Sequence, residues 1–141
     1  MSTTRARQPQ VPSVIRETSS PSVSVFWLDI QQVRRRLRDA ARQLGIAHPE
    51  IEEVWLFGSV ARGEAVPGSD ADLLVVLESS ELAFPERSGR YQPEFCGIGT
   101  DVLAYTRAEL VCMRAEGNPF LQEIESERRL LWKRTSGDSP T

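Results

Sequence analysis

The sequence predicts an α/β (α+β) domain in which about four β-strands are flanked by helices. Short apolar runs bounded by glycine, proline or aspartate, as at 54–57 and 73–77, are typical of buried strands. Apolar residues spaced three and four apart indicate amphipathic helices beside them. The folded part is expected over residues 24–134. Residues 1–23 and 135–141 are polar with few large apolar side chains, so they are expected to form flexible tails.

The composition disfavours several classes of protein. The chain has 141 residues, 40% of them hydrophobic and 26% charged, which is typical of one globular domain. No apolar stretch approaches the roughly 18–20 residues of a membrane span. A net charge of -3 argues against a nucleic-acid polymer as the partner. Cys96 and Cys112 lack zinc-like spacing and are expected to be reduced thiols, and the absence of a signal-like apolar segment predicts a cytoplasmic location.

The first helix is predicted to start at Phe26, because apolar residues recur from there to Leu44 at helical spacing. Gly45 is expected to be its C-terminal cap. Its outer face carries four arginines, which are interpreted as a solvated surface with no catalytic role. These arginines are Arg34, Arg35, Arg36 and Arg38.

The remaining elements follow from turn and capping signals. A strand over Val54–Phe57 should end at Gly58, with a short helix beginning at Ser59. A second strand, Leu73–Leu77, follows the Pro67-Gly68-Ser69 turn. The segment Ser79–Gly99 is expected to be irregular, with room for one helical turn.

Near the C-terminal end, Thr100–Tyr105 is predicted to be a third strand. Thr106 can cap the helix that follows, to about Glu116, and Glu109 completes a capping box. Asn118 can cap another helix with Pro119 at its first position, and a last strand is expected at Leu130–Trp132.

Two aspartates at the entrance of the second strand are the main chemical signal. Asp70 and Asp72 are two residues apart, so in a strand they lie about 6.5 to 7 Å apart along the backbone and both carboxylates point the same way. At about 6 Å two unpaired carboxylates repel by roughly 3 kcal/mol at an effective dielectric constant of about 20, which a divalent cation would relieve. Asp101 offers a third carboxylate if its strand lies beside the second. Three such groups could hold two Mg²⁺ ions for nucleotidyl transfer.

A glycine-serine turn precedes these acids and suits a phosphate. Gly58 permits close backbone approach, and Ser59 can offer N–H groups and its hydroxyl. Arg62, one helical turn later, could supply positive charge to the nucleotide. Each signal alone is ordinary, since Gly-Ser turns and exposed Asp-x-Asp turns occur in many loops. Their combination favours a nucleotide-binding site.

With these residues, Leu56–Gly63 and Ser69–Leu73 resemble the minimal nucleotidyltransferases of the DNA polymerase beta-like superfamily. The resemblance covers about residues 50–134. Its most specific positions are Gly58, Ser59, Asp70, Asp72 and Asp101. It implies a mixed palm-like sheet, ATP as substrate and Mg²⁺ at the three aspartates. Thr100 departs from the pattern, which usually has an apolar residue before the third acid.

The resemblance also implies a partner. Small members of this family commonly pair with a HEPN-type toxin, and the transferase, as antitoxin, adenylylates a hydroxyl of that toxin. Nothing in the chain looks like a second domain for a small acceptor, which favours a protein acceptor. A small-molecule nucleotidyltransferase of the antibiotic-modifying kind, and a catalytically silent antitoxin that acts by binding alone, remain alternatives. A homo-oligomer or hetero-oligomer fits each of them.

Overall fold

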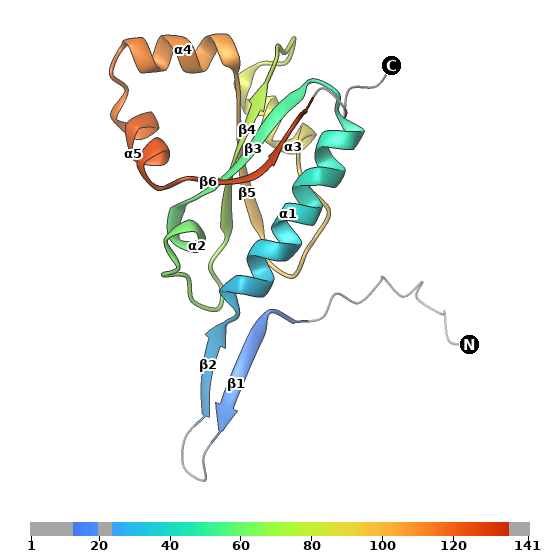
Figure 1. The fold of residues 1–141 in the computed structure, drawn as a ribbon, viewed down its shortest axis with the longest axis vertical. Coiled ribbons are helices and arrows are strands. Elements are labelled where there is room, and N and C mark those ends of the chain that lie inside the picture. Colours follow the sequence, from blue (N-terminus) through green and yellow to red (C-terminus); the bar gives the residue numbers. More distant parts are fainter. Residues whose placement is uncertain (1–12, 20–23, 136–141) are drawn as a thin grey trace, which may run out of the picture.

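A computed structural model describes residues 13–19 and 24–135 of the chain. Its centre is a four-stranded sheet in the order β5-β4-β3-β6 (Figure 1). The strands are β3 (Ile51–Phe57), β4 (Ala71–Leu77), β5 (Thr100–Thr106) and β6 (Arg129–Lys133). β3 pairs antiparallel with β4 and β6, whereas β4 and β5 are parallel. The predicted mixed sheet of four strands flanked by helices is therefore confirmed.

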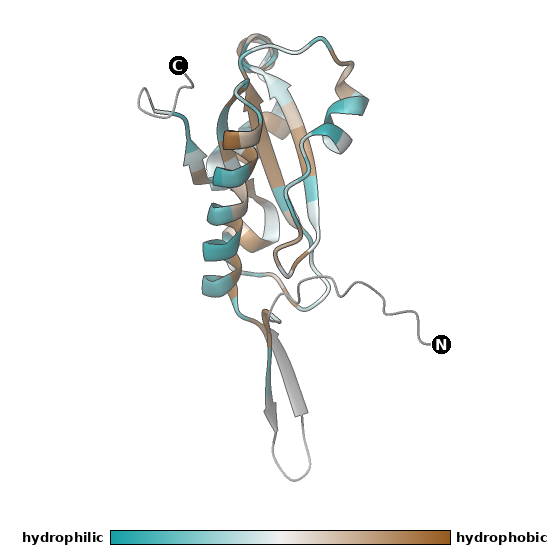
Figure 2. Ribbon diagram, turned by 90° about the vertical axis from the view of Figure 1, so that its right-hand side faces the viewer, coloured by the Kyte–Doolittle hydropathy of each residue, from teal (hydrophilic) through white to brown (hydrophobic). Residues whose placement is uncertain are grey.

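Helices cover both faces of this sheet. They are α1 (Ile30–Ala47), α2 (Gly58–Arg62), α3 (Phe84–Arg90), α4 (Arg107–Ala115) and α5 (Pro119–Glu127). Successive strand residues point to opposite faces, and in β4 Leu73 and Val75 join the core under α1 while Leu74 and Val76 join a second core under α4 and α5. Burial on both faces explains why β4 is a continuous apolar run. Figure 2 shows the hydrophobic residues gathered in the sheet and hydrophilic ones along much of α1.

The structure corrects the start of the first helix. The helix begins at Ile30 rather than Phe26, because the Asp29 side chain accepts a hydrogen bond from the Gln32 N–H and caps it there. The preceding residues form a strand, β2 (Ser24–Leu28), which is rich in β-branched and aromatic residues. It pairs antiparallel with β1 (Ile15–Ser19).

The β1–β2 pairing also bears on the predicted tails. Ile15–Ser19 lies inside the segment 1–23 that was expected to be flexible, and this part of the prediction is wrong because the segment finds a strand partner. Asp29 also donates its backbone N–H to the Val14 carbonyl at 2.7 Å. Residues 1–12, 20–23 and 136–141 lie outside the described residues.

The sequence position of Gly45 suggested a C-terminal cap for α1. This prediction is wrong, because Gly45 lies inside the helix. A methyl group on Gly45 would overlap the ring of Trp132 in β6. The glycine is there so that β6 can pack closely on α1. The helix instead ends at Ala47, and its C-cap residue His48 donates its N–H to the Leu44 carbonyl at 3.0 Å.

The segment 79–99 is more ordered than predicted, since it contains the seven residues of α3. Arg87 of this helix is only 5% exposed. Its guanidinium donates to the carbonyls of Leu82 at 3.0 Å and Ala104 at 3.3 Å, and pairs with Glu109 at 2.5 Å. These contacts attach α3 to β5 and α4, and an isolated arginine in a polar loop gave no sign of them.

The C-terminal elements confirm their capping signals. Thr106 and Glu109 form a capping box at α4, and the Asn118 side chain accepts from the Leu121 N–H at 3.1 Å at the start of α5. None of the helices in the described ranges combines the length and apolar character needed to cross a membrane.

Candidate functional site

The sheet brings the three predicted aspartates to one region. In the parallel β4–β5 pair, Asp72 lies directly opposite Asp101. Asp70 is two residues before Asp72 and is therefore on the same face, the one that α4 and α5 cover further along the strands. Gly99 makes room for it, because a methyl group there would lie 2.5 Å from Asp70 Oδ1. β5, which carries Asp101, therefore lies beside β4, as a site shared by the three aspartates requires.

The carboxyl group of Asp72 has a raised pKa. Burial raises the pKa of its carboxyl, and the negative charges of Asp101, Asp70 and Glu127 raise it further. Arg62 lowers the pKa of Asp72 but does not reverse the shift. Ionised Asp72 thus lies where negative charge is in excess, which is the setting that a bound cation would neutralise.

Gly58 is required for two reasons. Its φ is +76°, in the left-handed region that favours glycine, and a side chain there would overlap Asp72 Oδ2. The contact follows from register, since Phe57 is the residue of β3 that pairs with Asp72. The turn after β3 and the acids of β4 therefore form one structural unit.

A cavity of about 310 Å³ opens beside this unit. Gly58, Ser59, Arg62 and Asp72, which the sequence singled out, line part of it. Residues of α5, which the sequence did not single out, line another part. The α5 residues are Phe120, Glu123, Ile124 and Glu127. Their spacing of three and four places them on one face of the helix, but only the packing of α5 beside α2 turns that face toward Gly58.

Arg62 is already engaged by carboxylates. Its Nη1 lies 2.6 Å from Glu127 Oε2, and its Nε lies 2.9 Å from Glu64 Oε2. These hydrogen bonds raise the pKa of Arg62 above its ordinary value. The predicted phosphate-binding arginine is therefore at the cavity but paired with protein acids, so a phosphate would have to compete with Glu127 for it.

The three aspartates have the right ligand atoms for a divalent cation, but their side chains are not grouped around one point. Within residues 13–19 and 24–135, no three His, Cys, Asp or Glu side chains are grouped so that they could hold a metal ion. Carboxylate oxygens are nevertheless the ligands that Mg²⁺ prefers, together with water and phosphate oxygens. The register of Asp72 with Asp101, and the raised pKa of Asp72, fit such an ion.

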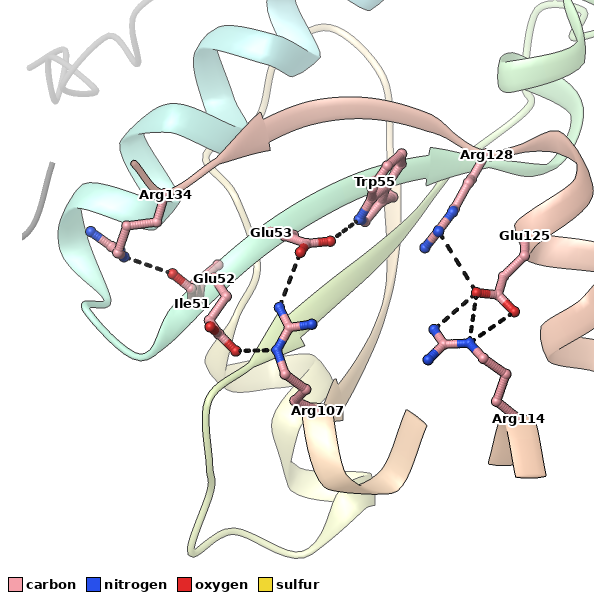
Figure 3. A network of polar contacts seen from close by, with 9 residues as sticks. All are labelled: Ile51, Glu52, Glu53, Trp55, Arg107, Arg114, Glu125, Arg128 and Arg134. Carbon is pink, nitrogen blue, oxygen red and sulfur yellow. Dashed lines mark hydrogen bonds and ion pairs between the residues drawn. The ribbon is translucent and has the colours of Figure 1, made fainter. Parts of the chain in front are cut away.

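A polar network anchors the α5 wall of the cavity (Figure 3). Glu125 of α5 pairs with Arg114 of α4 at 2.9 Å and with Arg128 at 3.7 Å. The Arg128 guanidinium lies over the Trp55 ring of β3, 4.0 Å from its centroid. Arg107, at the start of α4, reaches Glu52 and Glu53 on the same strand (Figure 3). These contacts attach α4 and α5 to β3, the strand that ends immediately before Gly58.

A comparison of the sequence with protein-family models identifies the family of this chain. The family model described as "Nucleotidyltransferase domain" matches residues 34–131. The chain belongs to this family. The matched range contains Gly58, Ser59, Arg62 and all three aspartates. The sequence resemblance to nucleotidyltransferases is thereby confirmed.

One solved structure supports the nucleotidyltransferase fold. A candidate nucleotidyltransferase from Sulfolobus solfataricus shares 22% identity and a TM-score of 0.53, over 74% of this chain and 84% of that one. At this identity the likeness shows the fold. A toxin-antitoxin structure with AMP-PNP shares 19% identity with a TM-score of 0.42, over 79% of this chain and 78% of that one. No curated protein matches the chain.

Proposed function

We propose that the chain is a Mg²⁺-dependent nucleotidyltransferase that transfers AMP from ATP to a hydroxyl group of a partner protein. The observation that carries the proposal is the register of Asp72 beside Asp101, with Gly58 packed against Asp72. Membership of the nucleotidyltransferase family supports the reaction class. The protein acceptor and the choice of AMP rest on the motif resemblance and go beyond family membership.

Asp70, Asp72 and Asp101 would hold two Mg²⁺ ions, which supply charge neutralisation of the triphosphate and a lower pKa for the acceptor hydroxyl. Gly58 and Ser59 would receive the β- and γ-phosphates, since the absence of a side chain at Gly58 keeps the backbone accessible. Arg62 would exchange Glu127 for a phosphate oxygen.

The acceptor oxygen then forms a bond to the α-phosphorus as the α–β phosphoanhydride bond breaks. Pyrophosphate leaves and the hydroxyl proton is released to solvent. The role of the carboxylates of Asp70 and Asp72 is to fix where this exchange occurs.

We propose a HEPN-type toxin as the protein acceptor and the cytoplasm as the site of action, as the motif resemblance implies. The chain would then be the antitoxin of the pair. Adenylylation of a toxin hydroxyl would add bulk and negative charge where the toxin acts, and both would oppose its activity.

The test is a transfer assay with the full chain, α-labelled ATP, Mg²⁺ and the product of the neighbouring gene. Label on the partner is expected from the wild type and from Asp39→Asn, an exposed change on α1 away from the site. Asp72→Asn and Asp101→Asn should abolish it. No label on the partner, with pyrophosphate released on a panel of small hydroxyl compounds, would replace this proposal by a small-molecule nucleotidyltransferase.

A second candidate is an antitoxin that acts by binding alone. It is favoured by the two carboxylates that engage Arg62, and by the lack of a three-residue metal group in the described part of the chain. The Asp70→Asn, Asp72→Asn double variant separates the two candidates. Undiminished neutralisation of the toxin by that variant would establish binding as the function.

A further inference from the structure

We propose that Phe57 and Phe120 form the nucleobase subsite of the cavity, with the base of a nucleoside triphosphate stacked on Phe120. This inference rests on the proposed function, because it assumes that the cavity takes a nucleoside triphosphate. It adds the residues that distinguish a nucleotide from a bare polyphosphate, which neither the aspartates nor the Gly58 turn can do.

The two rings differ in what covers them. Phe57 ends β3 immediately before Gly58 and is 8% exposed, so its ring belongs to the core. Phe120, the second residue of α5, is 45% exposed. The rings meet edge to face, with centroids 6.4 Å apart and planes at 84°. The buried ring therefore supports the exposed one, and much of the Phe120 side chain remains accessible to a planar ligand.

The cavity lining combines polar and apolar groups, as a nucleotide does. Gly58, Ser59 and Asp72 line it where triphosphate and cations are proposed to bind. Phe120 and the buried Ile124 supply apolar surface from α5, next to Glu123 and Glu127 of the same helix. About 310 Å³ is at the lower end of the volumes of small-molecule sites, roughly 300–1,000 Å³. An aromatic face beside an anion site matches a base attached to a polyphosphate better than either part alone.

Phe120 is held in place before any ligand arrives. Pro119 occupies the first turn of α5, Asn118 caps it, and Leu121, the next residue, is 1% exposed. The Glu125–Arg114 pair fixes the other side of the helix (Figure 3). A side chain with two rotatable bonds on an anchored turn loses little conformational entropy when a base stacks on it.

Glu123 adds a preference among bases. It lines the same cavity one turn after Phe120 and is exposed. A carboxylate accepts hydrogen bonds but cannot donate them when ionised, so it can pair with the exocyclic amino group of adenine, whereas uracil has none. We therefore expect ATP to bind more tightly than UTP.

The experiment measures binding of ATP and of inorganic tripolyphosphate to the full chain by calorimetry, with Mg²⁺ present. Phe120→Ala should weaken ATP binding roughly 10-fold, as expected for a lost base-aromatic stack, and leave tripolyphosphate binding unchanged. Phe120→Trp should retain ATP binding. Phe95→Ala, at a phenylalanine that is 67% exposed outside this cavity, should change neither. Glu123→Gln should reduce the ATP to UTP ratio, because an amide can also donate to uracil.

Each other result counts against the subsite. Unchanged ATP binding in Phe120→Ala would overturn it, and so would an equal loss of ATP and tripolyphosphate, which would mean that the variant damaged the cavity. Equal affinity of the wild type for both ligands would overturn the subsite and leave the proposed function standing. Binding of neither ligand would overturn both.

Discussion

Asp72→Asn is expected to make the protein more stable while it abolishes nucleotidyl transfer. The reason lies in the raised pKa of Asp72, which burial and the carboxylates of Asp101, Asp70 and Glu127 produce. A raised pKa means that ionised Asp72 is less favourable in the folded chain than in the unfolded chain. Asparagine keeps the shape of the side chain and removes the charge.

The size of the effect follows from the strand register. Asp72 and Asp101 are opposite each other on neighbouring strands, which lie about 5 Å apart, and this spacing sets the scale of the repulsion between their carboxylates. Two charges at that separation repel by about 3 kcal/mol at a dielectric constant of about 20, and by about 0.8 kcal/mol in bulk water. Asp101 and Asp70 are exposed and Asp72 only half-buried, so the weaker value applies. We expect a gain of about 0.5–1 kcal/mol in the free energy of unfolding.

The gain should depend on pH with a definite sign. For a group with a raised pKa in the folded chain, stability is greatest below the unfolded pKa, here near its ordinary value of 3.8, and is lost as pH rises through the folded pKa. The advantage of Asp72→Asn over the wild type is therefore full above the folded pKa of Asp72 and shrinks as pH falls toward 3.8. Added salt should also reduce it, since screening weakens repulsion between exposed charges.

Urea unfolding of the wild type, Asp72→Asn, Asp101→Asn and the double variant measures these effects. The two single changes relieve the same repulsion, so the double variant should gain less than their sum. Asp39→Asn is the control and should change little. Mg²⁺ should stabilise the wild type more than Asp72→Asn, because only the wild type keeps the ligand. A loss of stability in Asp72→Asn at pH 7 would refute the account of charge excess.

Three further changes test other parts of the fold and site. Arg87→Met should lower the free energy of unfolding, measured in urea, by about 2–3 kcal/mol, because it leaves two carbonyls and Glu109 without their donor. Arg107→Met breaks exposed ion pairs and should cost less than about 1 kcal/mol. Equal losses in the two variants would contradict the argument from burial. Gly58→Ala should lower the free energy of unfolding by at least about 1 kcal/mol because of the positive φ, and it should also weaken ATP binding. A variant with the wild-type melting temperature and ATP affinity would show that neither the positive φ nor the contact with Asp72 requires glycine. Glu127→Gln should strengthen ATP binding by about 2–5-fold in calorimetry, since Arg62 would lose a charged competitor, while weaker binding would assign Glu127 a supporting role.

The sequence was sufficient where the signal is local. Capping at Thr106 and Asn118 depends on side chains within three residues of the helix start, and both caps are present. The continuous apolar run of β4 likewise required burial on two faces. These features needed no knowledge of distant parts of the chain.

The sequence was insufficient where the reason for a residue lies far away in the chain. Gly45 resembled a helix cap, but the ring that requires a glycine there belongs to Trp132. The start of α1 was wrong because β1 offers Ser24–Leu28 a strand partner that helical spacing does not show. No motif singled out Phe120, and only the packing of α5 beside α2 places it at the cavity.

The candidate site likewise combines residues that local spacing identifies with contacts between distant parts of the chain. Asp70, Asp72 and Gly58 were recognisable from spacing, but the state of Arg62 depends on Glu127, which is 65 residues away. Three carboxylates raise the pKa of Asp72, and one of them also pairs with the arginine that lowers it. A triphosphate entering this cavity by itself would add negative charge to a region already in excess. Nucleotide binding should therefore require divalent cations from the first step, and the cation and the triphosphate should each increase the affinity for the other.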